Sequence, residues 1–214
     1  RWTADRGMQV LGSLGLYGST AYGVSADGNV VVGLSSGRAF RWTAANGMQD
    51  IGTLGGSNGW AFGVSADGSV VVGKASYPEW GIAYSRAFRW TASGGMQNLG
   101  TLLPRYASSV ARATSADGSV VVGWAYNDYE DIRQHLAFRW TERGGMENLN
   151  LTYAHLLTNR SILLEATAIS SNGRYIVGTG YNAATGRYEG YLLDTVPEPA
   201  SLLALGVGLS LIHI

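Results

Sequence analysis

The 214-residue chain contains no cysteine, which excludes a disulfide framework, a thiolate metal site and a cysteine nucleophile. Charged side chains are also scarce, at 14% of the residues, and the formal net charge is zero. Lys74 is the only lysine. The chain therefore lacks the basic field that attracts nucleic acid, and we expect no nucleic-acid partner.

Glycine and aromatic residues are abundant instead, with 31 Gly, 12 Tyr and 7 Trp, and they favour short strands joined by tight turns. One block, Arg-Trp-Thr followed by Gly-Met, occurs four times. Its copies begin at Arg1, Arg41, Arg89 and Arg139. A second block, Ser-Ala-Asp-Gly-x-Val-Val-Val-Gly, alternates with the first. It begins at Ser25, Ser65 and Ser115, with a degenerate copy at Ser170. The period of roughly 40 to 55 residues is in the range of propeller blades.

Each repeat unit is predicted to form four short antiparallel strands. In the second unit we expect them at Ala61–Ser65, Val70–Lys74, Arg86–Thr91 and Met96–Leu102. Asp67-Gly68 between apolar runs is a strong hairpin signal, because both residues tolerate positive φ. Phe88 and Trp90 share one face of their strand, and Arg89 points the other way. The run of three valines shows no alternation, as expected for a strand covered on both faces.

One such unit cannot bury both of its faces alone, so the fold is predicted to be all-β, a β-propeller-like array of four-stranded antiparallel blades over residues 1–195. A parallel β-solenoid is the rival, although its coils are usually shorter. About four units are present. The leading half-unit could join the last unit to close a four-bladed ring, or the units could form an open arc of a larger ring.

The length of the repeat varies between its second and third strands, at Leu34–Gly37, Ala75–Ser85 and Ala125–Leu136. Such loops project from one rim and are where a binding function is expected. Aromatic residues that lie in or beside these loops are candidates for stacking on sugars. They are Trp60, Trp80, Tyr84, Trp124, Tyr126 and Tyr129. A second variable segment, Asn150–Glu165, contains enough apolar residues at Leu151–Leu157 for one helical turn.

Repeated polar residues allow a functional and a structural interpretation. Asp27, Asp67 and Asp117 could bind calcium, but each stands alone beside a glycine, and a role in the turn is the better interpretation. The arginines before the tryptophans could form a ring for glycans, but equivalent positions favour a repeated contact between blades. Asp128, Glu130 and Asp131 in the longest loop are interpreted as a solvated acidic patch rather than a cation site. No metal or other cofactor is expected.

The blocks Ala-Phe-Arg-Trp-Thr, Gly-Met-Gln-Asp/Asn-Leu/Ile-Gly-Thr-Leu and Ser-Ala-Asp-Gly-Ser-Val-Val-Val-Gly resemble the HAF family of bacterial extracellular repeats. The resemblance covers about Arg1 to Thr195. It implies an exported or surface protein, and it says little about molecular activity.

The composition changes after Thr195, where Val196-Pro197-Glu198-Pro199-Ala200 precedes an apolar run. This segment, residues 196–214, resembles the PEP-CTERM sorting signal of Gram-negative bacteria, which is read by an exosortase-type membrane enzyme. The resemblance implies that Pro197, Glu198 and Pro199 are recognised and that the apolar run associates transiently with the membrane. Ala200–Ile214 is shorter than the about 20 residues that span a bilayer, and no basic end follows. The alternative is a buried apolar strand or helix packed on the propeller.

Arg1 falls inside a repeat unit, and the tail lacks its basic end, so we expect a fragment with a truncated C-terminus. Taken together, the sequence predicts a non-enzymatic structural or binding module, exported to the envelope, cell surface or extracellular matrix of a Gram-negative bacterium. Its expected partners are an exosortase-type enzyme and an extracellular polysaccharide. The alternative is a β-propeller enzyme acting on glycans, which needs two buried carboxylates facing each other in a cleft.

Overall fold

A computed structural model describes residues 2–5, 7–79, 82–104, 107–127, 134–157 and 160–196. Within these ranges it contains five antiparallel sheets and one short helix, so the all-β prediction is confirmed. The tail after Val196 lies outside the described residues. In the part of the chain that the structure describes, no helix is long and apolar enough to cross a membrane.

The sheets follow the repeat, and their strands pair in sequence order. The half-blade is β1 (Trp2–Thr3) and β2 (Gly7–Met8). The first blade is β3 (Ser19–Val24), β4 (Val30–Ser35), β5 (Arg38–Thr43) and β6 (Gly47–Asp50). The second blade is β7 (Gly59–Val64), β8 (Val70–Glu79), β9 (Ile82–Thr91) and β10 (Gly95–Asn98). The third blade is β11 (Ala107–Thr114), β12 (Val120–Asn127), β13 (Leu136–Thr141) and β14 (Gly145–Asn148). The fourth blade has three described strands, β15 (Ile162–Ile169), β16 (Tyr175–Asn182) and β17 (Arg187–Asp194).

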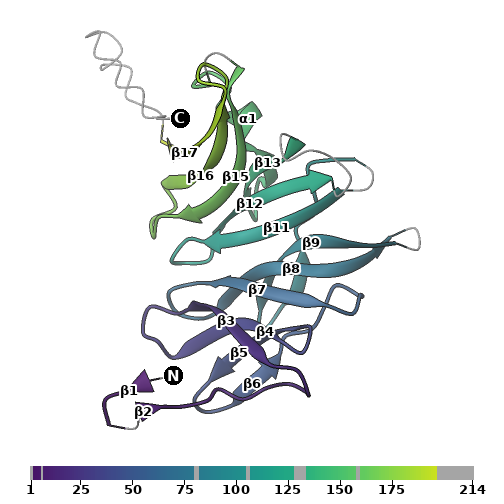
Figure 1. The fold of residues 1–214 in the computed structure, drawn as a ribbon, viewed down its shortest axis with the longest axis vertical. Helices are drawn as coiled ribbons and strands as arrows, with labels where there is room; N and C mark the ends of the chain where they lie inside the picture. The colour runs from purple at the N-terminus through teal and green to yellow at the C-terminus, as the bar shows by residue number, and fades with distance from the viewer. Residues whose placement is uncertain are drawn as a thin grey trace.

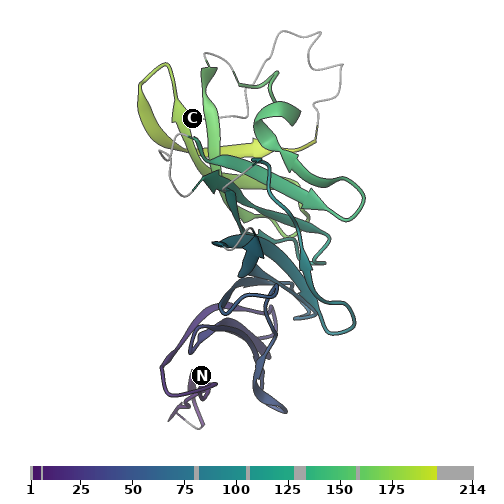
Figure 2. The same ribbon diagram turned by 90° about the vertical axis from the view of Figure 1, so that its right-hand side faces the viewer.

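The blades stack in chain order into an open array, with the half-blade at one end and the fourth blade at the other (Figures 1 and 2). The half-blade does not join the fourth blade, so the four-bladed ring is not formed and the open arrangement is the one observed. The fourth blade already has its third strand, β17, and β1 is also a third strand, since Trp2 pairs with Met8 as Trp42 pairs with Met48. Joining the two would duplicate a strand.

The hydrophobic core lies between neighbouring blades. Val71 belongs to the cluster shared with the first blade, whereas Val70 and Val72 belong to the cluster shared with the third blade. All three are buried, so the run of valines is covered on both faces as predicted. Phe88 is fully buried against the first blade, with Trp90 packed on the same cluster, which confirms their shared face.

The glycine that ends each valine run is required by close packing. The first strand of each blade changes register beside it, between Ala61 and Gly63 in the second blade. This irregularity brings the Trp60 carbonyl so close that a Cβ on Gly73 would lie 1.9 Å from that oxygen and 2.9 Å from the Phe88 ring. Since neither group can withdraw without disturbing the blade, only glycine fits.

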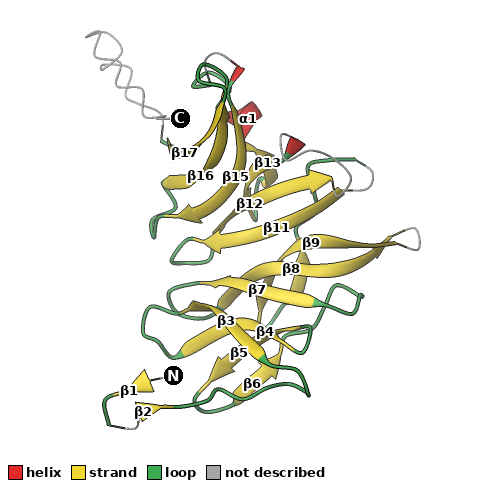
Figure 3. Ribbon diagram, viewed as in Figure 1, coloured by secondary structure: helices red, strands yellow, loops and turns green. Residues whose placement is uncertain are grey.

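Two local predictions need correction (Figure 3). The sequence predicts a loop at Ala75–Ser85, but β8 extends to Glu79 and β9 begins at Ile82, so the described part of this insertion lengthens a hairpin. Each residue from Ala75 to Glu79 pairs with one from Ile82 to Arg86, and a hairpin satisfies backbone groups that a loop would leave to water. The helical turn is present, but it is α1 (Leu149–Thr152), which begins before the expected Leu151–Leu157 because Asn148 caps it.

Replacing Gly73 by alanine should lower the free energy of unfolding by about 3 kcal/mol, because the added methyl overlaps a backbone oxygen. Chemical denaturation measured by tryptophan fluorescence would report this change. Gly18→Ala is the matched control, since a Cβ there meets nothing within 4 Å. Equal stability of the two variants would contradict the packing described for the blade.

Candidate ligand-binding site

The Ser-Ala-Asp-Gly segments form equivalent turns between the first two strands of the first three blades, and Ser170-Ser171-Asn172-Gly173 forms the corresponding turn in the fourth. Ser65 Oγ donates to the Asp67 carboxylate over 2.6 Å and accepts the Val70 N–H, and Asp67 also accepts the Ser69 N–H. These bonds, led by the one from Ser65, lower the pKa of Asp67 to about 2. The carboxylate is therefore a turn element, as predicted. Among the described residues, no group of three or more His, Asp or Glu side chains could hold a metal ion.

Successive turns are joined to one another by backbone hydrogen bonds. Ala26 N–H donates to the Ala66 carbonyl, Ala66 N–H to that of Ala116, and Ala116 N–H to that of Ser171, over 2.9–3.0 Å. The repeated arginines add a second link, because Arg41 Nε donates to Gly68 O and Arg89 Nε to Gly118 O, both over 3.1 Å. The structural interpretation of these two arginines is confirmed.

Arg139 departs from this pattern. Its Nε is buried and has no hydrogen-bond partner in the described part of the chain. A charge interaction with Arg139 acts on Tyr153, a buried residue just after α1, and opposes the rise in its pKa that burial causes. The segment that carries α1 thus gives Arg139 different surroundings from those of Arg41 and Arg89. Sequence repetition alone does not indicate this difference.

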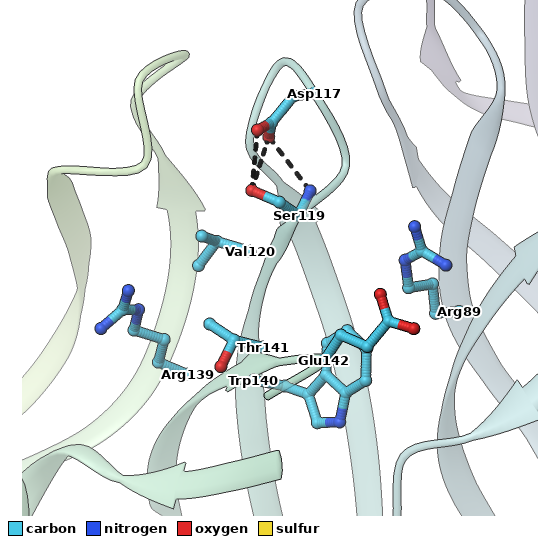
Figure 4. Close-up of a pocket in the computed structure, with 8 residues that line it drawn as sticks. All are labelled: Arg89, Asp117, Ser119, Val120, Arg139, Trp140, Thr141 and Glu142. Carbon is cyan, nitrogen blue, oxygen red and sulfur yellow. Dashed lines mark hydrogen bonds between the residues drawn. The ribbon is translucent and has the colours of Figure 1, made fainter. Parts of the chain in front are cut away.

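A pocket of about 390 Å³ opens where Arg139 lies, between the second and third blades (Figure 4). It is lined by Arg89, Asp117, Ser119, Val120, Arg139, Trp140, Thr141 and Glu142. The buried side chains of Val120 and Trp140 supply its apolar part. The two arginines stand on opposite sides, and the Asp117–Ser119 turn lies between them, as Figure 4 shows. The polar lining thus combines two guanidiniums, two carboxylates and two hydroxyls around an apolar surface.

The electrostatics of the pocket are suited to binding. Hydrogen bonds from Ser115 and Ser119 lower the pKa of Asp117 to about 2, so this carboxylate stays ionised at neutral pH. Asp117 and Glu142 are both exposed. They are therefore not the buried, facing pair that the enzyme alternative needs. Charged acceptors and donors beside a tryptophan edge can engage the hydroxyls of a sugar.

The predicted aromatic residues are not brought together in this pocket. Trp60, Trp124 and Tyr126 are half-buried. Lys74 Nζ lies 5.0 Å from the centre of the Trp60 ring, and Tyr126 packs 5.4 Å from His135. These contacts occupy ring surface that a sugar would need.

The prediction that Tyr84 is an exposed stacking residue is wrong. It is buried, with the Arg86 guanidinium 5.6 Å from its ring centre, because the longer β9 folds it into the sheet. Trp80, Tyr129 and the acidic cluster at Asp128, Glu130 and Asp131 lie outside the described residues. So do Pro197, Glu198, Pro199 and Ala200, whereas Val196 is described and half exposed.

The pocket and the variable loops lie on opposite rims. The pocket uses the turn between β11 and β12 and the turn between β13 and β14. The variable segments connect second to third strands and therefore leave the sheets at the other end, where the β8–β9 hairpin projects in Figure 1. The expectation that binding residues lie only on the variable rim consequently missed this pocket.

Glu142 is the pocket residue that the sequence could have indicated. The other copies have Ala4, Ala44 and Ala92 at this position, immediately after Arg-Trp-Thr, and only the copy that begins at Arg139 has an acid. Another pattern, Gly33-Leu34-Ser35-Ser36-Gly37, has the spacing of a serine-hydrolase elbow. Ser35 is fully buried at the end of β4 and accepts the Leu14 N–H, which is a structural role.

The chain matches no protein-family model and no curated protein. It is similar to solved structures, among them a protein assigned as TolB from Agrobacterium tumefaciens, at 18% identity and a TM-score of 0.53 over 83% of this chain. TolB from Acinetobacter baumannii is similar at 12% identity and a TM-score of 0.52 over the same share. The fold is a β-propeller array. The chain spans 58% and 41% of the lengths of these two proteins, and at such low identity the likeness concerns the fold alone.

Proposed function

We propose that this chain is an exported β-propeller binding module of the bacterial envelope or cell surface, and that its inter-blade pocket binds a polysaccharide. The observation that supports the binding role most directly is the departure of the third repeat from the other two. Arg139 lacks the inter-blade bond that Arg41 and Arg89 make, and Glu142 replaces an alanine at the same pocket. Both changes concern polar groups that line one cavity.

The chemistry of the pocket favours a polyhydroxylated ligand. Two cations and two anions balance one another, so the pocket does not select strongly for net charge. Ser119 and Thr141 add short hydroxyl groups, and Trp140 offers an aromatic edge beside them. A sugar chain presents hydroxyls that can both donate and accept, together with apolar ring faces, and this combination matches the lining.

A binding role is favoured over glycan hydrolysis by the state of the carboxylates. A glycosidase needs one carboxyl whose pKa is raised so that it can protonate the leaving group. The pKa of Asp117 is instead lowered by its turn hydrogen bonds, and Glu142 is exposed. Asp117 therefore lacks the raised pKa that a general acid needs, and neither described carboxyl of the pocket is buried.

Glu142→Ala should weaken the binding of a bacterial extracellular polysaccharide by about tenfold, or ~1.4 kcal/mol, because a charged hydrogen-bond acceptor is lost. Titration calorimetry of the purified chain with fragments of that polysaccharide measures the change. The substitution introduces the alanine that the first and second blades have at this position, Ala44 and Ala92, so the fold should be unaffected.

Arg143→Ala is the matched control, because Arg143 is exposed in the same turn but does not line the pocket. Unchanged affinity in Glu142→Ala, or an equal loss in Arg143→Ala, would place the ligand elsewhere. No binding by the parent chain to any fragment would contradict the polysaccharide proposal itself.

We also propose that Val196–Ala200 is read by an exosortase-type enzyme, as the resemblance implies. The support is positional: β17 ends at Asp194, and the half-exposed Val196 lies two residues later. Glu198→Ala should leave the protein in the cell fraction of an exosortase-producing host, whereas the parent is released to the surface. Glu79→Ala serves as a control for loss of one acid. Equal release of parent and Glu198→Ala would contradict the sorting role.

A further inference from the structure

A β-bulge interrupts the first strand of all four blades at the same place. Phe62 of β7 has no partner on β8, although both of its neighbours in sequence are paired. The register shifts in β3, β11 and β15 leave Tyr22, Arg112 and Thr167 unpaired in the same way. A bulge takes one residue out of the hydrogen-bonded ladder and re-aims its side chain. We call these four residues the bulge row.

The bulge row is the variable position of a segment that otherwise repeats. An alanine precedes it in every blade, a glycine or alanine follows it, and the serine of the turn comes three residues later. The bulge position itself carries tyrosine, phenylalanine, arginine and threonine in turn. A contact that held the blades together would use the same residue each time, as Arg41 and Arg89 do. The changing residue therefore points to a role other than joining blades.

The bulge row is continuous along one edge of the array, because the first strands of neighbouring blades lie side by side (Figure 1). A Cβ on Gly63 would lie 3.2 Å from the Arg112 carbonyl oxygen, so adjacent bulges pack closely. The Tyr22 and Phe62 ring centroids are 5.4 Å apart, and Arg112 Cζ lies 5.2 Å from the Phe62 centroid. Phe62 thus stands between a phenol and a guanidinium that the two neighbouring blades contribute.

Arg112 is a cation held in place with its hydrogen-bond donors uncommitted. The residue is exposed, and among the described residues no hydrogen bond or ion pair engages its guanidinium. A guanidinium that lies against an aromatic ring keeps its N–H groups in its own plane, and these form the fork that binds a carboxylate. No member of the bulge row is acidic, so nothing within the row neutralises the charge. The row is therefore complementary to an anionic group.

We propose that the bulge row binds the carboxylate of an acidic sugar, so that the polysaccharide recognised by this chain contains uronic acid units. This inference rests on the proposed function, which makes the ligand a polysaccharide. Arg112 supplies the selectivity for acid that the balanced charges of the inter-blade pocket do not. Phe62 is a positioning residue that acts through Arg112. Tyr22 and Thr167 add hydroxyl groups at the two ends of the row.

Oligogalacturonate and its methyl ester are a matched pair of probes, because esterification removes the charge and keeps the sugar chain. In titration calorimetry the parent chain should bind the acid at least tenfold more tightly than the ester. Added salt should reduce this preference, since exposed charges are screened. Arg112→Gln should lower the affinity for the acid about tenfold and leave that for the ester unchanged. Arg143→Gln, which removes a charge from an exposed turn, should change neither affinity.

Phe62→Leu tests the positioning role, because leucine keeps an apolar side chain at the bulge but removes the ring under the guanidinium. The preference for the acid should fall about threefold while the affinity for the ester stays the same. Loss of affinity for both probes alike would contradict a role that acts through Arg112.

Glu142→Ala separates this inference from the proposed function, because it should weaken the acid and the ester by the same factor. Equal affinity of the parent chain for acid and ester would overturn the bulge-row proposal and leave polysaccharide binding in place. An unchanged preference in Arg112→Gln would also overturn it. Unchanged affinities in Glu142→Ala, together with a lost preference in Arg112→Gln, would instead contradict the inter-blade pocket and support the bulge row.

Discussion

The fold depends on the turn between the first two strands of each blade, which is made by Ser-Ala-Asp-Gly in the first three blades and by Ser170-Ser171-Asn172-Gly173 in the fourth. In this turn the serine hydroxyl and the aspartate carboxylate satisfy the local backbone, and the central alanine is left free to bond to the next turn. The resulting ladder from Ala26 to Ser171 sets both the spacing and the register of four successive blades. Once the turns are fixed in this way, the valine faces meet and the inter-blade cores follow. Repetition of a short polar sequence thus determines how large apolar surfaces are placed, which is typical of stacked repeats.

Much of this arrangement was predictable because repetition and the two-residue period of strands are local properties. The hairpin at Asp67-Gly68, the opposite faces of Phe88 and Arg89, and the double covering of Val70–Val72 follow from them. The ends of the strands could not be predicted from these local properties. β8 and β9 extend to Glu79 and Ile82 because cross-strand pairing continues there, and pairing between two segments is not visible in either one.

The candidate pocket could be predicted only in part, because it depends on contacts between distant segments. Arg139 has the same neighbours in sequence as Arg41 and Arg89, but the segment with α1 and Tyr153 gives it different surroundings. Glu142 was visible as a departure from the repeat, although its position beside Arg89 requires the stacking of two blades. Tyr84 was misjudged for the related reason that its burial depends on the longer hairpin.

Amide hydrogen exchange tests the central role of the ladder most directly. Ala66 and Ala116 lie in turns at the surface, where amides normally exchange fast, but their N–H groups bond to the next blade. Their exchange should be as slow as that of Val71 in the core of β8, and it should be far slower than that of Ser93 in the turn before β10. Exchange of Ala66 and Ala116 at the rate of Ser93 would contradict the account, because the blades would then be held together without the ladder.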